Sequence, residues 1–219
     1  MFPIIDVIST SCAIHRINNG FIGKHDVRYD KKYEGKKSNS DLLYNYFYNQ
    51  EVIEITDADK LQAEEIIDYL KGLSFKAIER ELTEFETNVL RLVNSKEIEK
   101  DKLGISASLP KVYLNKVEQD NWTARENILA QTSQALGTLH ERGEFVGVVE
   151  YVRYIPKTMS YIISCSVDNK HILKFFADKE LKLNSTVTLE GYVKSQNRGR
   201  YHNGIETLIN RIKIASNSW

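Results

Sequence analysis

The stretch TVTLEGYVKSQNRGRYHNGIETLINRIKI, residues Thr186–Ile214, decides how the C-terminal third of the chain folds. In its first part, apolar Val187, Leu189 and Val193 alternate with polar residues, which is the two-residue period of a half-buried strand. A glycine-containing segment with basic and aromatic residues follows, and the chain returns as a second strand over Glu206–Ile214. We interpret the two strands and their basic, aromatic loop as a nucleic-acid-binding element.

The same alternation recurs upstream of this stretch. Strand patterns cover Glu144–Ile155, Met159–Val167, His171–Ala177, Thr186–Lys194 and Glu206–Ala215. Only a short turn, DKELKLN, separates the third pattern from the fourth. Five short strands with such tight connections favour a small closed barrel with a Greek-key path. Closure removes exposed sheet edges, so we expect that the domain can stay monomeric.

Apolar residues at helical spacing precede the barrel. A first helix is predicted to begin at Thr56 or Asp57, either of which is a suitable N-cap residue. A second is predicted to begin near Ser74, or at Thr83 with Glu86 as a capping box. The apolar stripes of these helices indicate a packed core rather than a cofactor site.

A third helix is predicted over Lys100–Lys116, where Pro110 should start, kink or end it. The polar segment Asp120–Glu141 then marks a domain boundary. The predicted fold class is α+β, with a helical domain over residues 41–140 and a five-stranded barrel over residues 141–219.

Residues 1–40 are predicted to form a basic extended arm with stacking aromatic rings, or a small hairpin. The segment HRINNGFIGKHDVRYDKKYEGKKSNSD is rich in Gly, Asn and Lys, and short strands or an extended arm both fit it. A solvated loop is the alternative.

The chain is neutral overall, but its charge is unevenly distributed. Arg16 to Lys37 contains seven bases and three acids, Glu51 to Asp101 contains fourteen acids and seven bases, and residues from 140 onward contain twelve bases and eight acids. Because phosphate attraction is screened beyond about 10 Å at moderate salt, local charge matters more than the total. Basic ends therefore flank an acidic middle, and they are compatible with nucleic acid.

A chain of 219 residues with 42% hydrophobic and 27% charged residues is typical of a globular protein with a buried core. No stretch reaches the roughly 18 apolar residues of a membrane span, and we expect no secretion signal. Cys12 and Cys165 form no metal-ligand cluster, and so few thiols indicate a reducing compartment. The expected location is the cytoplasm, or the host cytoplasm if the chain is viral.

Catalysis, a metal site and a cofactor are not predicted. The sequence has neither a GxxxxGK phosphate loop nor a GxSxG elbow. The acidic group Glu64, Glu65 and Asp68 is interpreted as a solvated helix face. The histidines are scattered without an HExxH spacing: His15, His25, His140, His171 and His202.

The barrel residues resemble an OB-fold module found in phage and bacterial proteins of DNA metabolism, of the single-stranded-DNA-binding type. The likeness lies in GEFVGVVEYVRYIPKTMSYIISC, HILKFFAD and NSTVTLEGYVKSQNRGRYHNGIETLINRIKI, and in the upstream segment LTEFETNVLRLVNSKEIEKDKLGISASLPKVY. It covers Ser74–Ala215. Members of the group end in a Gly-x-Val-Lys strand, a basic loop with an aromatic residue and a glycine, and a strand with Thr and Arg. The matching positions are Gly191, Val193, Lys194, Tyr201, Gly204, Thr207 and Arg211.

Two features depart from that group. Relatives often begin with a cysteine-rich zinc ribbon, for which this chain has no cysteines. Replicative single-stranded-DNA-binding proteins often finish with an acidic tail that recruits partners, whereas this sequence finishes IKIASNSW. We therefore expect neither a zinc ribbon nor tail-mediated recruitment.

In OB-folds the ligand crosses strands two and three, between the loops that follow strands one and four. These loops correspond to about Ile155–Thr158 and Ser195–Asn203, and both carry basic residues. Strand alternation places Tyr192 on the solvent face, and it points Phe175 and Phe176 in opposite directions, so one of the two is expected to face the ligand. The predicted nucleic-acid-binding residues are Arg153, Lys157, Lys174, Phe175, Tyr192, Lys194, Arg198, Arg200, Tyr201, His202, Arg211 and Lys213.

The resemblance implies a non-enzymatic protein that binds single-stranded DNA with little sequence preference, as a phage-type replication or recombination accessory. Preference for DNA over RNA stays open. One alternative is a protein-interaction adaptor that binds a host or replisome partner through the barrel and the acidic helices. Another is an accessory subunit of a nuclease or primase whose activity lies in its partner.

Overall fold

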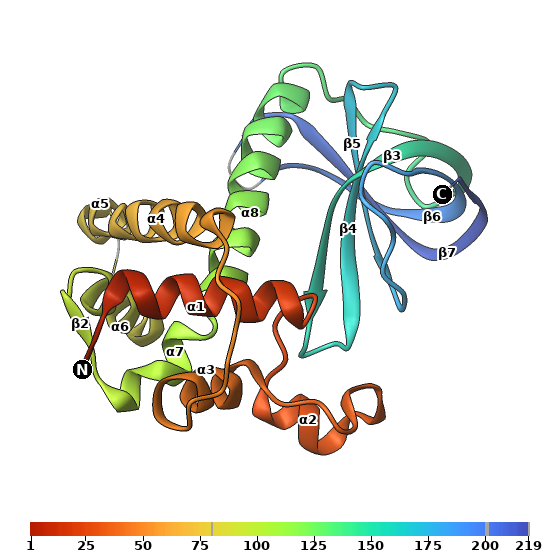
Figure 1. Ribbon diagram of the computed structural model, residues 1–219. Coiled ribbons are helices and arrows are strands. Elements are labelled where there is room, and N and C mark those ends of the chain that lie inside the picture. Colours follow the sequence, from red (N-terminus) through yellow and green to blue (C-terminus); the bar gives the residue numbers. More distant parts are fainter. Residues whose placement is uncertain (80, 200–201, 219) are drawn as a thin grey trace. The chain divides into compact units, whose positions relative to one another are not determined.

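The computed structural model describes residues 1–79, 81–199 and 202–218, which fall into two compact units, Met1–Lys116 and Val117–Trp219 (Figure 1). Helices make up the first unit, and a closed five-stranded barrel dominates the second. The predicted fold class, α+β with N-terminal helices followed by a C-terminal five-stranded OB-type barrel, is confirmed.

Short helices form the first unit. In chain order the elements are β1 (Phe2–Pro3), α1 (Ile4–Ile17), α2 (Lys24–Tyr29), η1 (Lys31–Tyr33), α3 (Asn39–Tyr48), α4 (Asp57–Lys71), α5 (Leu73–Glu79), α6 (Glu84–Val93), β2 (Glu97–Ile98), η2 (Lys100–Lys102), α7 (Leu103–Ser106) and the first part of α8 (Leu109–Ala130). Strands β1 and β2 pair as a short antiparallel ribbon.

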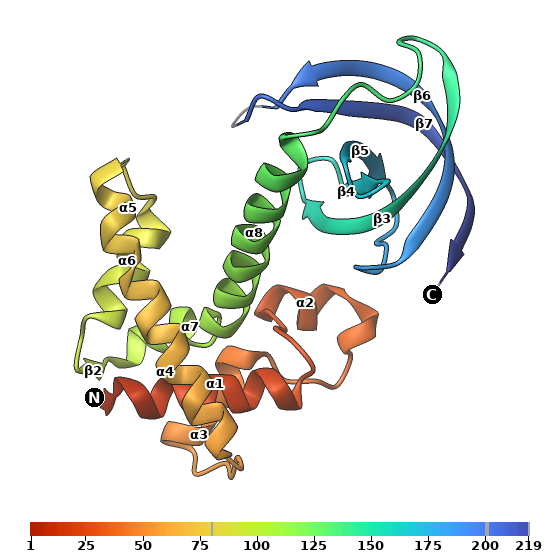
Figure 2. The ribbon, with the colours of Figure 1, turned by 90° about the horizontal axis from the view of Figure 1, so that it is seen from above.

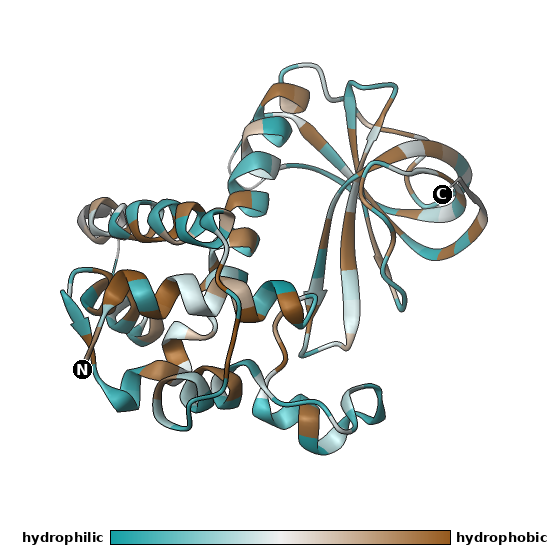
Figure 3. Ribbon diagram, viewed as in Figure 1, coloured by the Kyte–Doolittle hydropathy of each residue, from teal (hydrophilic) through white to brown (hydrophobic). Residues whose placement is uncertain are grey.

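Helix α1 lies in the core of the helical unit. Every side chain from Val7 to Ile14 is buried, and α1 packs against α3 and α4 (Figure 3). The hydroxyl of Thr10 donates to the Asp6 carbonyl at 2.7 Å, and that of Ser11 donates to the Val7 carbonyl at 2.8 Å. These bonds to the preceding turn satisfy hydroxyl groups that would otherwise be costly to bury.

The predicted arm or hairpin over residues 1–40 is wrong, because α1, α2 and η1 occupy most of this segment. A helix that is buried on most sides lacks the polar face that produces a helical period in the sequence. The following loop is also held in place: the side-chain oxygen of Asn39 accepts hydrogen bonds from the Ile22 backbone N–H and the Asn18 amide, both at 2.9 Å.

The predicted N-cap at Thr56 and the predicted capping box at Thr83 are confirmed, and Thr56 forms a capping box as well. Thr56 caps α4, where its hydroxyl accepts from the Asp59 N–H at 3.3 Å and the Asp59 carboxylate accepts from the Thr56 N–H at 2.8 Å. Thr83 and Glu86 make the equivalent pair of bonds at the start of α6. Helix α5 precedes α6 as a separate helix, so both proposed starting points of the second helix correspond to real helices.

The predicted third helix differs from the structure at both ends. The chain forms η2 and α7, and a new helix, α8, begins at Leu109 with Pro110 in its first turn. A proline there removes no helical hydrogen bond, because the first N–H groups of a helix have no partner within it. Helix α8 continues through the predicted boundary segment to Ala130, and the second unit begins inside it, at Val117, instead of at residue 141.

The barrel consists of β3 (Arg142–Ile155), β4 (Ser160–Val167), β5 (His171–Ala177), β6 (Thr186–Arg198) and β7 (Ile205–Ser218) (Figure 2). The strand order around the closed barrel is β3-β4-β5-β7-β6. Strands β5 and β7 run parallel and all other neighbours run antiparallel. This is the Greek-key arrangement expected of an OB-type barrel.

Both cysteines are buried, one in the core of each unit. Burial, with a smaller contribution from the Asp59 carboxylate, raises the pKa of Cys12 to about 12. Burial, followed by the nearby Glu150, raises the pKa of Cys165 to about 12 as well.

Asp59 joins α1 to α4. Its carboxylate accepts hydrogen bonds from Arg16 Nε at 3.1 Å and Nη2 at 2.8 Å while it caps α4. Burial alone would raise the pKa of Asp59, but the hydrogen bonds from Arg16 and Thr56 outweigh burial and hold that pKa below its usual value.

We expect Asp59→Asn to lower the free energy of unfolding of the helical unit by about 1–3 kcal/mol at pH 7, because hydrogen bonds to a charged group are lost. The pKa of Asp59 is lower in the folded protein than in the unfolded chain. The stabilisation by its carboxylate is therefore fully present above roughly pH 4 and is lost as the pH falls through the folded-state pKa. Urea unfolding at several pH values should show the difference from wild type shrinking in acid. Asp57→Asn, at a side chain 94% exposed on the same helix, is the control; equal effects of the two changes at pH 7 would contradict this role.

Candidate nucleic-acid interface

Helix α8 covers the barrel face on which an OB-fold ligand was expected, the outer side of β4 and β5. Ser164, Ser166 and Ile172 alternate with residues of the barrel core and therefore point outward, yet all three are buried. Leu129 and Trp122 of α8 form an apolar cluster with Ile172. The chain's own helix thus covers this part of the predicted groove, whereas Phe176, which also points outward on β5, is 47% exposed.

Polar contacts fasten this helix to β3 and β4. Arg125 of α8 donates to the Glu150 carboxylate at 3.1 Å, and the same carboxylate accepts from the Ser166 hydroxyl at 2.6 Å. Trp122 stacks on Tyr151 with ring centroids 5.9 Å apart and planes 8° from parallel. Burial is the main reason that the pKa of Tyr151 is raised.

Three predicted ligand-binding residues are engaged within the protein instead. Phe175 is fully buried in the barrel core, so the prediction that it contacts a ligand is wrong. The ammonium of Lys174 lies 2.6 Å from Glu126 Oε1 and 2.9 Å from Glu206 Oε2, so two carboxylates already neutralise it. His202 packs beside the same carboxylates with only 7% of its side chain exposed, which leaves no open ring face for a base.

A second group of predicted residues does come together, on the outer side of β6 and β7. On β6, Tyr192 and Lys194 point outward, and Val193 between them is buried. On β7, Lys213 pairs across the sheet with Glu190, which lies two residues before Tyr192. Arg142 at the start of β3 lies opposite Tyr192. We call the outward side chains Arg142, Tyr192, Lys194, Arg211 and Lys213 the β6–β7 face.

Arg211 reaches Tyr192 because the backbone of β7 is irregular. The register of β6 and β7 shifts between Glu190 and Tyr192, and Arg211 adopts a left-handed φ of 49°. A bulge of this kind re-aims a side chain, and the Arg211 guanidinium lies 5.8 Å from the centre of the Tyr192 ring. A left-handed conformation is uncommon for a residue other than glycine, and such residues concentrate at functional sites.

The other predicted residues lie apart from this face or outside the described residues. Arg153 and Lys157 are exposed near the β3–β4 turn, at the opposite end of β3 from Arg142. Arg198 is exposed at the end of β6. Arg200 and Tyr201 are outside the described residues.

Sequence reasoning missed several contributors to these surfaces. Arg142 donates to Glu190 at 2.9 Å, and the ring of His140 lies 6.2 Å from that of Tyr192. On α8, the spacing of Trp122, Arg125 and Leu129 is that of one helix face, a signal that was present in the sequence of the segment interpreted as a polar domain boundary.

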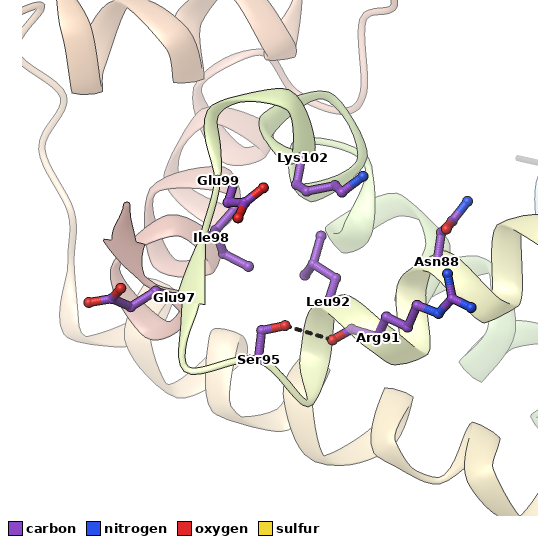
Figure 4. A pocket seen from close by; sticks show the side chains of 8 residues that line it. All are labelled: Asn88, Arg91, Leu92, Ser95, Glu97, Ile98, Glu99 and Lys102. Atoms are coloured by element: carbon purple, nitrogen blue, oxygen red, sulfur yellow. Dashed lines mark hydrogen bonds between the residues drawn. The ribbon is translucent and has the colours of Figure 1, made fainter.

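A pocket of about 190 Å³ lies in the helical unit between α6, β2 and η2 (Figure 4). Its lining mixes both charges and includes Arg91, Lys102, Glu97 and Glu99. Small-molecule sites usually measure about 300–1,000 Å³ and are mainly apolar, so we assign no ligand to this pocket.

No protein-family model matches the chain, and no match is found among curated proteins or among solved structures. Within the described part of the chain, none of the helices combines the length and the apolar character that crossing a membrane requires.

If α8 covers β4 and β5 as described, Trp122→Ala should lower the free energy of unfolding of the barrel unit by about 3–5 kcal/mol, because a large buried side chain leaves a cavity. Urea unfolding measures the change. Ile128→Ala, at a residue 58% exposed on the same helix, is the matched control and should have little effect. A Trp122 variant as stable as wild type would show that α8 is not held on the barrel.

Proposed function

We propose that the barrel binds single-stranded nucleic acid, with DNA as the expected class, on the β6–β7 face. The observation that supports this most is the Tyr192–Arg211 pair, an aromatic ring with a guanidinium 5.8 Å from its centre. Single-stranded nucleic acid needs rings on which bases stack and cations for its phosphates, and both recognition elements lie together here.

The surroundings of the pair fit the same ligand. Lys194 and Lys213 are exposed on the face, and they extend the positive charge along both strands. Glu144 and Glu190 lie opposite each other on β3 and β6, and Arg142 forms an ion pair with Glu190. The few cations of the face, one of them paired with a carboxylate, favour weak binding through phosphate contacts, with a salt dependence that scales with the number of these contacts.

The binding surface that we propose differs from the usual OB-fold groove. In the usual groove the ligand crosses the strands that correspond to β4 and β5. Here α8 covers Ser164, Ser166 and Ile172 on those strands, and Glu126 and Glu206 neutralise Lys174, the cation that β5 contributes. On the β6–β7 face, predicted cations remain exposed beside an aromatic ring that one of them contacts.

A second candidate function is a protein-interaction adaptor. The observation in its favour is that the β4–β5 side of the barrel already holds a helix through an aromatic stack, apolar contacts and ion pairs. The surface chemistry of the barrel is therefore suited to protein segments as well. The two candidates differ in whether the wild-type protein binds a bare oligonucleotide.

Tyr192→Ala is expected to weaken binding of a fluorescein-labelled oligothymidylate by about 1–3 kcal/mol, the value of one stacked base. Arg211→Gln should also weaken it and should reduce the slope of log affinity against log salt by roughly 0.7, the effect of one lost phosphate contact on a single strand. Fluorescence anisotropy at roughly 50 and 200 mM salt measures both quantities.

Lys157→Gln is the matched control, since it removes an exposed cation of the barrel at the β3–β4 turn, away from Arg142 and Tyr192. Its affinity and salt slope should equal those of wild type. If the Lys157 variant loses as much affinity as the Arg211 variant, the binding surface is misplaced. If the wild-type protein shows no saturable binding at low salt, the adaptor becomes the better proposal.

A further inference from the structure

Three side chains that could hold a metal ion converge where α8 meets the β6–β7 loop. Glu126 comes from α8, Glu206 from the start of β7 and His202 from the loop, and one donor atom of each lies within 4.8 Å of the other two. His202 Nε2 is 3.1 Å from Glu206 Oε1 and 4.0 Å from Glu126 Oε1. All three residues belong to the barrel unit.

The histidine is buried and lacks hydrogen-bond partners among the described residues. Its side chain is only 7% exposed, and neither ring nitrogen makes a hydrogen bond to a residue that the structure describes, although Glu206 Oε1 lies 3.1 Å from Nε2. Glu126 Oε1 is also buried without a hydrogen bond, although Lys174 Nζ forms an ion pair with it at 2.6 Å. Buried polar atoms are nearly always paired, so an orphaned imidazole that faces two carboxylates indicates a missing ligand.

The site also gathers negatively charged oxygen donors around the imidazole. The carboxylates of Glu126 and Glu206 lie beside it, and Lys174 forms an ion pair with each of them. A divalent cation would bind both carboxylates and accept the imidazole lone pair.

We propose that Glu126, His202 and Glu206 form a binding site for Zn²⁺. One imidazole and two carboxylates suit a borderline cation such as zinc, whereas magnesium and calcium prefer oxygen ligands alone. Donor atoms around a tetrahedral zinc lie roughly 3.3 Å apart, given bonds of about 2.0–2.2 Å. The 3.1 Å and 4.0 Å separations from His202 Nε2 come close to that spacing.

Lys174 is the competitor for this site. Its ammonium lies within ion-pair distance of both carboxylates, where a metal ion would bind. Zinc binding therefore requires the long, flexible side chain of Lys174 to move aside. The side chains of Lys174 and Glu206 are 18% and 22% exposed, so both the departing ammonium and an arriving ion have a route to solvent.

The experiment is isothermal titration of the purified chain with ZnCl₂, with the thermal unfolding midpoint as a second readout. Wild type should bind one equivalent of zinc, and zinc should raise the midpoint. Loss of an outer-shell partner already weakens metal sites about 10–100-fold, so loss of the ligand in His202→Ala should weaken binding by more than about tenfold. MgCl₂ should produce neither a binding isotherm nor a shift.

Lys174→Met provides the sharper test, because removal of the competing cation should tighten zinc binding whereas a nonspecific site would not respond. His25→Ala, which removes an exposed histidine from the helical unit, should leave the affinity unchanged. Glu206→Gln keeps the side-chain shape and checks the His202 result if the alanine variant unfolds. The proposal is overturned if wild type does not bind zinc. It is also overturned if the ligand variant (His202→Ala, or Glu206→Gln where the alanine variant unfolds) and Lys174→Met both bind zinc with the affinity of wild type.

Discussion

Helix α8 supplies polar and apolar partners to the outer side of the barrel. Its Arg125 donates to Glu150 of β3, which also accepts from Ser166 of β4, and its Glu126 pairs with Lys174 of β5. Trp122 of the same helix stacks on Tyr151 of β3. This one helix–sheet contact decides which part of the barrel surface remains free for a ligand: Ser166 and Ile172 are buried, whereas Phe176 on the same side of β5 is exposed.

Local patterns in the sequence predicted a large part of the fold. The alternation around Val187 and Leu189 identified the barrel strands, and the N-cap residue Thr56 and the capping box at Thr83 identified helix starts, because these signals depend on neighbours within a few residues. Helix α1 escaped prediction for the opposite reason. Its face is defined by packing against α3 and α4, which are distant in sequence, and the hydroxyls of Thr10 and Ser11 are satisfied by its own backbone.

The site was predictable only where one side of a strand meets solvent. On β6 the alternation correctly placed Tyr192 and Lys194 outside. On β5 both sides carry apolar residues, because the barrel core covers Phe175 while α8 covers Ile172. Alternation alone does not tell which of two apolar sides faces the core, so the assignment of Phe175 to the ligand failed, and Phe176 on the opposite side is the exposed ring. The neutralisation of Lys174 also depends on long-range contacts that no local pattern reveals.

The burial of the two thiols has a practical consequence for anyone who wishes to follow motions of this molecule. The thiolate is the reactive species, and with pKa values of about 12 Cys12 and Cys165 present almost none of it at neutral pH. Maleimide or nitroxide reagents should therefore leave the folded native chain unmodified. A single cysteine engineered at an exposed position would be labelled selectively, without removal of either native one, so distance measurements by spin or fluorescent probes start from an intact core.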